Sequence, residues 1–236
     1  MNILIRINLL YFLFWGCGCL FAQNATRQQL IENSAIDYLR VVDNHSALYY
    51  GNLQEGLPRA TNHPYLNDAQ YAKARLSYRN VIYPEELLRL DLNRNELIIL
   101  SPDYRNIVLF PENVDFAELH GQHIIYFRRD SLPGSPSSGY YFQLHSGKCR
   151  ILEKQSTALL IDSYHNFYYS LTTRYYLFHD DGYYIIRNQG GLLKVFKPYK
   201  KELKRFISAN KLLYRNNPKE FLIRTVNEYE KLSSAL

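Results

Sequence analysis

Residues 174–187 read RYYLFHDDGYYIIR, two apolar, tyrosine-rich runs on either side of a turn sequence. An Asp-Gly turn tolerates the positive φ angles that a tight β-hairpin connection requires. We therefore predict antiparallel strands at residues 174–179 and 183–187, joined by Asp180-Asp181-Gly182.

The same pattern continues toward the N-terminus. Two further hairpins are expected, each with turn residues at its centre: 88–100 around Asn93-Arg94-Asn95, and 139–154 around Ser146-Gly147. A segment rich in Pro, Gly and Ser at residues 131–139 is expected to be a loop. The other short apolar runs are predicted to be strands as well: 105–110, 114–119, 122–128 and 192–196.

Helical patterns lie at both ends of the chain. Thr26-Arg27-Gln28-Gln29 has the form of a capping box, which predicts an N-terminal helix within residues 23–44. Near the C-terminus, Pro198 precedes a first amphipathic segment, and Asn217-Pro218 is typical of the start of a second helix.

Together these patterns predict an α+β fold. It consists of an antiparallel β-meander of hairpins with about nine to eleven short strands, one N-terminal helix and two C-terminal helices. We expect the hairpin-rich sheet over residues 46–196 and a basic helical C-terminus over 198–236. Residues 23–236 are expected to form a single domain, because a chain of this length buries a sizeable core.

The first 22 residues have the features of a cleavable export signal. Arg6 supplies positive charge and is followed by an apolar run over residues 9–21. A membrane-spanning helix needs about 20 apolar residues, so this run is too short to remain as an anchor. Signal peptidase requires a small residue at its cleavage site, and we therefore expect cleavage after Ala22.

The three cysteines also bear on the compartment. Acylation of Cys17 or Cys19, which would make a lipoprotein, is disfavoured because the bulky residues 14–16 precede them. After cleavage only Cys149 remains, so the mature chain cannot form an internal disulfide. A cysteine-poor exported domain fits a bacterial periplasm or cell envelope.

Four segments carry a resemblance to a known family. Strand-and-turn patterns occupy residues 90–98, 139–148 and 175–184, and an apolar run leads into a basic helix at residues 192–204. They resemble a signal-peptide-bearing, exported family of Bacteroidetes-type bacteria that has no assigned activity, and the resemblance covers about residues 45–230. Where that family has an aspartate before Gly147, this chain has Ser146. The resemblance implies residence in the bacterial envelope and carries over no catalytic residue.

The chain contains 22 tyrosines, many of them in adjacent pairs. Neighbouring residues of a strand point to opposite faces, so each pair places one ring outward or toward a second layer. The candidate aromatic contacts with a polysaccharide or protein partner are Tyr141, Tyr176 and Tyr184. Packing of the rings within half-buried strands is the favoured alternative.

Positive charge is concentrated near the C-terminus. Residues 194–224 contain ten basic and two acidic residues, whereas the whole chain has a net charge of +6. Such a patch could attract an anionic membrane surface or an acidic envelope protein. The plainer interpretation is a helix face that is merely exposed to water and binds no partner. Export removes nucleic acid from consideration. The candidate anionic-partner residues are Lys197, Lys200, Lys201, Lys204 and Arg205.

No residue pattern predicts catalysis, a metal site or a cofactor. His120 and His123 are spaced like metal ligands, but two ligands do not make a site. The chain has no Gly-x-Ser-x-Gly elbow or phosphate-binding glycine loop, and Cys149 is expected in the core. We therefore predict a non-enzymatic binding or structural module of the envelope. The alternatives are a carbohydrate-binding module and a hydrolase that uses carboxylates such as Asp115 and Glu118.

Overall fold

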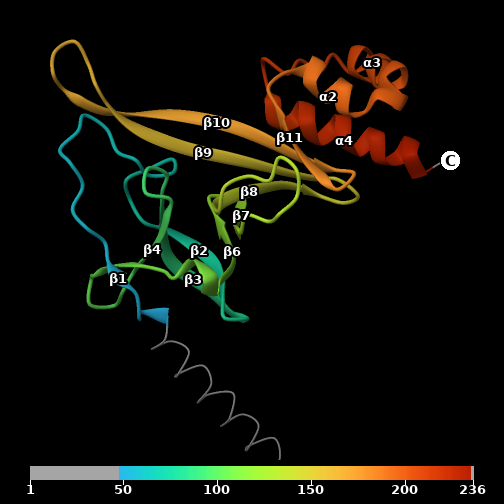
Figure 1. Ribbon diagram of the computed structural model, residues 1–236. Helices are drawn as coiled ribbons and strands as arrows, with labels where there is room; N and C mark the ends of the chain where they lie inside the picture. Colours follow the sequence, from blue (N-terminus) through green and yellow to red (C-terminus); the bar gives the residue numbers. More distant parts are fainter. Residues whose placement is uncertain (1–47, 235–236) are drawn as a thin grey trace, which may run out of the picture. The chain divides into compact units, whose positions relative to one another are not determined.

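A computed structural model of the chain describes residues 48–234 (Figure 1). The chain separates into two units, Met1–Leu48 and Tyr49–Leu236, and almost all described residues belong to the second. The predicted export signal, residues 1–22, and the predicted helix within residues 23–44 lie outside the described residues. Both stay predictions.

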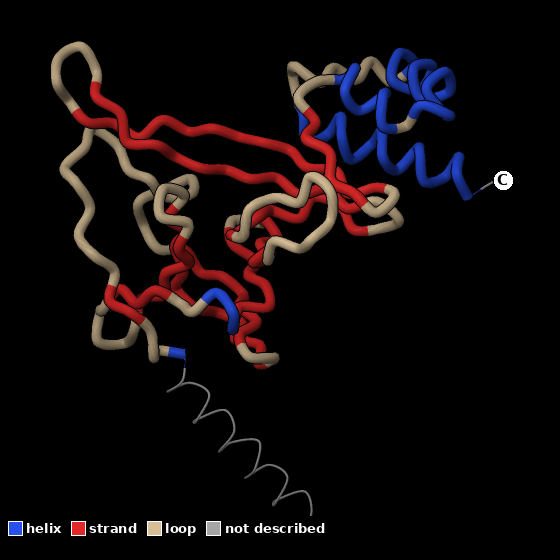
Figure 2. Tube along the Cα trace, viewed as in Figure 1, coloured by secondary structure: helices blue, strands red, loops and turns tan. Residues whose placement is uncertain are grey.

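A single antiparallel sheet makes up most of the second unit (Figures 1 and 2). Its strand order is β1-β5-β4-β3-β2-β6-β7-β8-β9-β10-β11. The strands have the following bounds: β1 (Asn52–Leu53), β2 (Ala72–Tyr78), β3 (Val81–Asp91), β4 (Glu96–Leu100), β5 (Asn106–Val108), β6 (Val114–Leu119), β7 (Gln122–Phe127), β8 (Gly139–Ser146), β9 (Arg150–Ile161), β10 (Phe167–His179) and β11 (Gly182–Ile186).

The sheet extends in two directions from β2, which pairs along both of its edges. Leu76 of β2 lies opposite Tyr83 of β3 on one edge and opposite Ala117 of β6 on the other. The strands β3, β4, β5 and β1 therefore follow on one side of β2, and β6 to β11 follow on the other.

The longest hairpin is formed by β9 and β10, with twelve residue pairs. In its turn, Asp162 Oδ1 accepts hydrogen bonds from the backbone N–H groups of Tyr164 and Asn166 at 2.8 and 2.9 Å. An aspartate that binds its own turn in this way stabilises the turn locally. Figure 1 shows the hairpin extending past the neighbouring strands β8 and β11.

Three helices follow the sheet: α2 (Gln189–Val195), α3 (Lys200–Ala209) and α4 (Pro218–Ser234). Short 3-10 turns lie at Pro111–Asn113, before β6, and at Lys197–Tyr199, between α2 and α3. The helices lie beside one end of β9, β10 and β11 (Figures 1 and 2). Their buried side chains form one core with the sheet, which includes Ile151, Leu177, Leu203, Phe221 and Val226.

Side-chain alternation along β10 separates two cores. Tyr175 and Leu177 belong to the core beneath the helices, whereas Tyr176 between them belongs to an aromatic cluster with Tyr141 and Tyr183. Successive residues of a strand point to opposite faces, which assigns each member of a tyrosine pair to a different core. The paired tyrosines of this strand are therefore packing residues on both faces of the sheet.

The predicted α+β meander of short hairpins is wrong, because one large, continuous sheet contains all the strands. Strands β3, β9 and β10 are 11, 12 and 13 residues long. The order of a meander is also broken where β6 pairs with β2. Turn residues report only which strands are joined in sequence, so they could not reveal this pairing of distant segments.

Residues 192–196, predicted to be the last strand, lie largely in α2. Asn188 Oδ1 accepts a hydrogen bond from Gly191 N–H at 2.8 Å and so caps the start of this helix. A short apolar run fits a buried strand and a buried helical turn equally well, which explains the error. The C-terminal region therefore contains three helices and not two.

Two predictions that rested on explicit turn or capping residues are confirmed within the described residues. β10 and β11 form the hairpin predicted at residues 174–187. Its turn consists of Asp180 and Asp181, with φ angles of 45° and 59°. Asn217 caps α4, because its Oδ1 accepts a hydrogen bond from Glu220 N–H at 3.1 Å.

Candidate functional site

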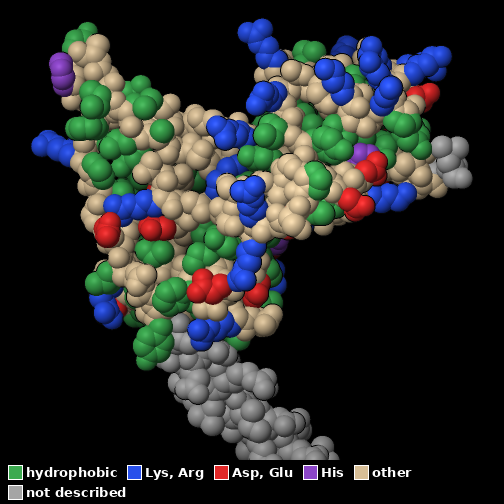
Figure 3. All heavy atoms as spheres, viewed as in Figure 1, with side chains coloured by type: hydrophobic (Ala, Val, Ile, Leu, Met, Phe, Trp, Pro, Cys, Tyr) green, Lys and Arg blue, Asp and Glu red, His purple; other side chains and the backbone are tan. Residues whose placement is uncertain are grey.

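Exposed basic side chains gather on α2, on the 3-10 turn Lys197–Tyr199, on α3 and on the segment that follows α3. We call this surface the basic helical face, and its members are Lys194, Lys197, Lys200, Lys201, Lys204, Arg205, Lys211 and Arg215. Figure 3 shows basic side chains over this helical region. Within residues 48–234, none of the eight forms an ion pair. Glu202 is the only acidic residue between positions 194 and 215.

The amphipathic pattern of α3 places half of this face in solvent. Leu203 and Ile207 lie one turn apart and are buried in the core shared with the sheet. Apolar residues four positions apart line one side of a helix, so the residues between them point outward. The outward basic residues of α3 are Lys200, Lys201, Lys204 and Arg205.

All five predicted patch residues lie on the basic helical face. Two other basic residues of the segment 194–224 do not belong to it, because each is paired with a carboxylate. Lys219 Nζ lies 2.9 Å from Glu153 Oε2 in β9. Arg224 pairs with Glu220 at 3.2 Å and donates to Asn210 Oδ1 at 2.6 Å. The accessible surface therefore has eight cations and not ten.

A buried carboxylate attaches the start of α4 to the sheet. Glu153 is 1 % exposed, and Gln155 Nε2 donates a hydrogen bond of 2.7 Å to its Oε1. A carboxylate keeps its charge in such a place only when it is paired, and Lys219 of α4 supplies the cation. The sequence signal for this contact was an acidic residue within the apolar run of β9, and sequence reasoning missed it.

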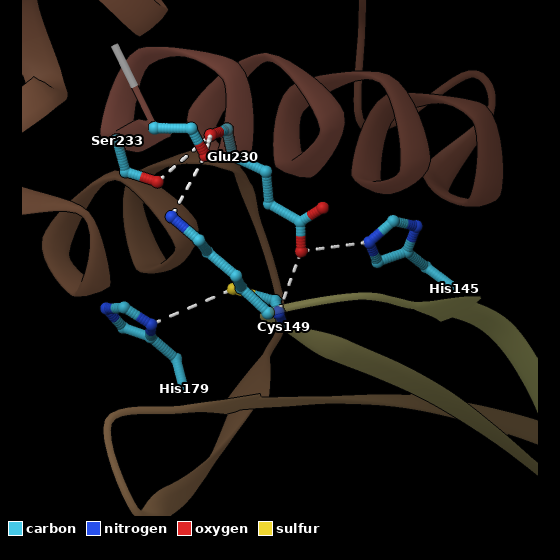
Figure 4. A network of polar contacts seen from close by, with 7 residues as sticks. His145, Cys149, His179, Glu230 and Ser233 are labelled. Atoms are coloured by element: carbon cyan, nitrogen blue, oxygen red, sulfur yellow. Dashed lines mark hydrogen bonds and ion pairs between the residues drawn. The ribbon is translucent and has the colours of Figure 1, made fainter. Parts of the chain in front are cut away.

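A second carboxylate attaches the end of α4 (Figure 4). Glu230 Oε1 accepts a hydrogen bond from Cys149 N–H at 2.7 Å and lies 3.1 Å from His145 Nε2. Partial burial alone would raise the pKa of Glu230, but the Cys149 N–H and His145 outweigh burial and lower it. Gly147 makes room for this contact, since a Cβ there would lie 2.6 Å from Glu230 Oε2.

In the same cluster the Cys149 thiol contacts the His179 imidazole, which in turn contacts the Asp180 carboxylate. Cys149 Sγ lies 3.7 Å from His179 Nδ1, and His179 Nε2 lies 3.0 Å from Asp180 Oδ2. Such an order can activate a cysteine nucleophile only when the thiol is accessible and its pKa is low. Cys149 is fully buried, and burial together with Glu230 and Asp180 raises its pKa to about 12. The thiol is therefore a core residue, as the sequence predicted.

The three candidate aromatic contacts have different environments. Tyr141 and Tyr176 are 1 % and 8 % exposed and pack edge to face at 5.9 Å. Tyr141 Oη also donates to Ser137 O at 2.8 Å. These two rings cannot stack on a partner, so the proposal of outward rings is wrong for them. Tyr184 is 40 % exposed and remains available at the surface.

Of the side chains considered for metal binding or hydrolysis, His123 and Glu118 lie close together, with 3.9 Å between His123 Nδ1 and Glu118 Oε1. His120 lies in the β6–β7 turn with a φ of 52°, whereas His123 stacks on Phe116. Asp115 accepts hydrogen bonds from other groups of its own sheet, and Glu118 pairs with an arginine. Within residues 48–234 no group of three potential metal ligands occurs.

Comparison with known proteins gives no match: no family model, no curated protein and no solved structure resembles this chain. Within residues 48–234, no helix is both long enough and apolar enough to cross a bilayer.

Proposed function

We propose that this chain is an exported, non-enzymatic binding protein of the bacterial cell envelope, and that the basic helical face binds an anionic membrane surface. The observation that carries the proposal is the set of eight exposed cations without an ion pair in residues 48–234. Each Lys or Arg near an anionic lipid surface contributes about 1 kcal/mol of attraction.

The composition of the basic helical face favours a diffuse anionic surface over a single small anion. Six of its eight members are lysines, which act as mobile point charges, whereas specific carboxylate or phosphate sites tend to use the planar arginine fork. Leu213 is 58 % exposed and lies between Lys211 and Arg215 in sequence. An apolar side chain among cations can insert between lipid headgroups.

Two observations support this proposal over the alternatives. A carbohydrate-binding module would stack sugar rings on Tyr141, Tyr176 and Tyr184, but Tyr141 and Tyr176 are buried and cannot do so. A hydrolase needs two carboxylates that face each other across a cleft. Asp115 instead accepts hydrogen bonds from Ser77 Oγ and Asn80 N–H, and Glu118 pairs with Arg75.

Vesicle co-sedimentation tests the proposal. We expect the purified native protein to sediment with vesicles that contain phosphatidylglycerol and not with pure phosphatidylcholine. Binding should weaken at high salt, since screening shortens the reach of exposed charges to about 3 Å at 1 M ionic strength. The variant with four reversals, Lys197→Glu, Lys200→Glu, Lys201→Glu and Lys204→Glu, should no longer sediment.

The matched control carries the same change of net charge at exposed turn and loop positions outside the basic helical face: Arg59→Glu, Arg79→Glu, Arg128→Glu and Arg129→Glu. It should still sediment with anionic vesicles. Equal loss in both variants would mean that only net charge matters, and it would overturn the assignment to the basic helical face. Recovery of the protein with Met1 intact in a cytosolic fraction would overturn the proposed export.

A further inference from the structure

One edge of β10 is only partly paired. β9 covers the opposite edge along twelve residues. On the edge in question, β11 pairs with β10 from Tyr175 to His179. Near the other end, Thr61 N–H donates to Phe167 O at 2.9 Å. Within the described part of the chain, no strand pairs with residues 170–174 on this edge.

Leu171 and Thr173 direct their backbone groups toward this open edge. Just before them, Tyr169 exchanges two hydrogen bonds of 2.7 and 2.9 Å with the side chain of Asn62 on the same edge. In an antiparallel strand the N–H and C=O groups of alternate residues point to the same side. The β9–β10 register runs without a shift, so Leu171 and Thr173 follow Tyr169. Across residues 48–234 their edge-facing groups have no partner.

The open segment has room for a short added strand. Five residues, 170–174, separate the position bound by Asn62 from the position paired with β11. At about 3.4 Å per residue this is an edge of about 17 Å. Backbone groups at such an edge are a template for another strand.

A groove with positive walls borders the same segment. Its only charged lining residues are Arg174 and Arg187. Its other lining residues are Thr172, Thr173, Tyr175, Ile185, Ile186, Tyr214 and Pro218. Ile186 lies opposite Tyr175, so Arg187 follows at the position opposite Arg174. On the other side of β10, Lys154 of β9 also lies opposite Arg174.

Three cations therefore lie side by side across adjacent positions, although like charges that face each other across strands destabilise a sheet. Arg174 and Arg187 are exposed, and neither forms an ion pair within residues 48–234. Burial lowers the pKa of Lys154 to about 8, which reflects the cost of charge at that position. A carboxylate delivered to this row would offset the repulsion.

A second copy of the chain is a poor occupant of this edge. Antiparallel pairing of two identical β10 edges would bring a second Arg174 and Arg187 into the same region, and like charges disfavour that contact. A partner segment with alternating carboxylates has complementary charge and can also satisfy the backbone groups of Leu171 and Thr173.

We propose that the open edge of β10 at residues 170–174 is a docking site for an extended, acidic segment of a partner protein. The segment adds as a strand that pairs with Leu171 and Thr173, and its carboxylates reach Arg174 and Arg187. This site is separate in residues from the basic helical face and does not depend on the proposed membrane binding.

A synthetic peptide probe tests this proposal. The probe has about eight residues in which glutamate alternates with valine, a pattern that places all carboxylates on one face of a strand. We expect it to bind the purified native protein in fluorescence anisotropy, and the analogue with lysine in place of glutamate not to bind. Hydrogen–deuterium exchange should show new protection of the Leu171 and Thr173 amides.

Two variants separate backbone pairing from charge. Thr173→Pro removes the edge-facing N–H, and proline is tolerated on an edge strand when its missing N–H faces solvent. Arg174→Glu with Arg187→Glu reverses the charge. Each should weaken the glutamate probe at least about tenfold, and the doubly reversed protein should gain binding of the lysine analogue. Arg128→Glu with Arg129→Glu is the matched control and should bind the glutamate probe like the native protein.

Circular dichroism would establish that each variant is folded. Unchanged affinity in Thr173→Pro, or protection confined to residues 194–215 and absent from Leu171 and Thr173, would overturn the docking site while leaving the membrane proposal intact. The absence of any probe binding up to millimolar concentration would overturn it as well.

Discussion

Glu230 Oε1 and the backbone N–H of Cys149 are joined by a hydrogen bond of 2.7 Å, which ties the last turns of α4 to the residue before β9. At the other end of the helix, Lys219 pairs with Glu153 in the middle of the sheet. Carboxylates thus attach both ends of α4, and α4 shares one core with α2 and α3. The basic helical face is held in place by these contacts.

Replacement Glu230→Ala should lower the free energy of unfolding by about 1–3 kcal/mol, because the Cys149 N–H loses its acceptor. The pKa of Glu230 is lowered in the folded protein, so its contribution is present above the ordinary value of 4.5 and is lost as pH falls through the folded pKa. In urea titrations the difference in stability between the two proteins should therefore shrink as the pH falls below 4.5 and through the folded pKa of Glu230. Glu202→Ala, at an exposed site, is the control and should change little. A constant difference at every pH would contradict the assignment.

Gly147→Ala should destabilise the protein, since the new Cβ would lie 2.6 and 2.7 Å from the two Glu230 carboxylate oxygens. The comparison is Gly56→Ala, where an added Cβ meets no atom within 4 Å. Thermal unfolding should show a lower Tm only for the first variant. In Gly147→Ala combined with Glu230→Ala the losses should not add, because both act on one contact.

Lys219→Met should cost more stability than the double variant Glu153→Gln with Lys219→Met. The single replacement leaves a carboxylate that is 1 % exposed without its cation, which is strongly destabilising, whereas the double variant removes the charge. A urea double-mutant cycle measures the coupling between the two residues. A single variant as stable as the double one would show that the pair contributes nothing to the attachment of α4.

Lys154 should titrate with a midpoint near pH 8, because burial lowers its pKa to about 8 from the ordinary 10.5. Between these two values the unfolded chain binds more protons at this residue than the folded protein, so this group increases stability as pH rises through that window. Carbon-13 NMR of lysine Cε, with Lys154→Arg for assignment, gives the midpoint directly. A midpoint shared with the exposed lysines would contradict the prediction.

Local chemistry explains which parts of the fold were predictable from sequence. The hairpin around Asp180-Asp181 and the start of α4 at Asn217 were predicted correctly, because turn and capping residues act within about four positions along the chain. The segment 192–196 was assigned wrongly because a short apolar run has no periodicity of its own, and the capping role of Asn188 went unnoticed.

In the candidate site, too, local features were predictable from sequence and long-range contacts were not. The candidate patch residues of α3 were named from their charge, and they face solvent because Leu203 and Ile207 turn the opposite side of the helix to the core. Tyr141 and Tyr176 were named as candidate outward contacts, with packing inside the strands as the favoured alternative, and the structure confirms the packing, because both rings are buried in an aromatic cluster of the sheet. The partners of Lys219 and Glu230 lie 66 and 81 positions away and had no signal in their own neighbourhood.

The sequence by itself determined the turn at Asp180-Asp181, the start of α4 at Asn217, the β-rich character and the concentration of basic residues near the C-terminus, since each depends on residues close together along the chain. Only the tertiary structure decided that β6 adds to β2, that α4 is attached by Glu153 and Glu230, and that residues 170–174 keep an open edge. These features arise from which strand edges and buried charges find partners, and a strand edge pairs with whichever segment packing brings beside it.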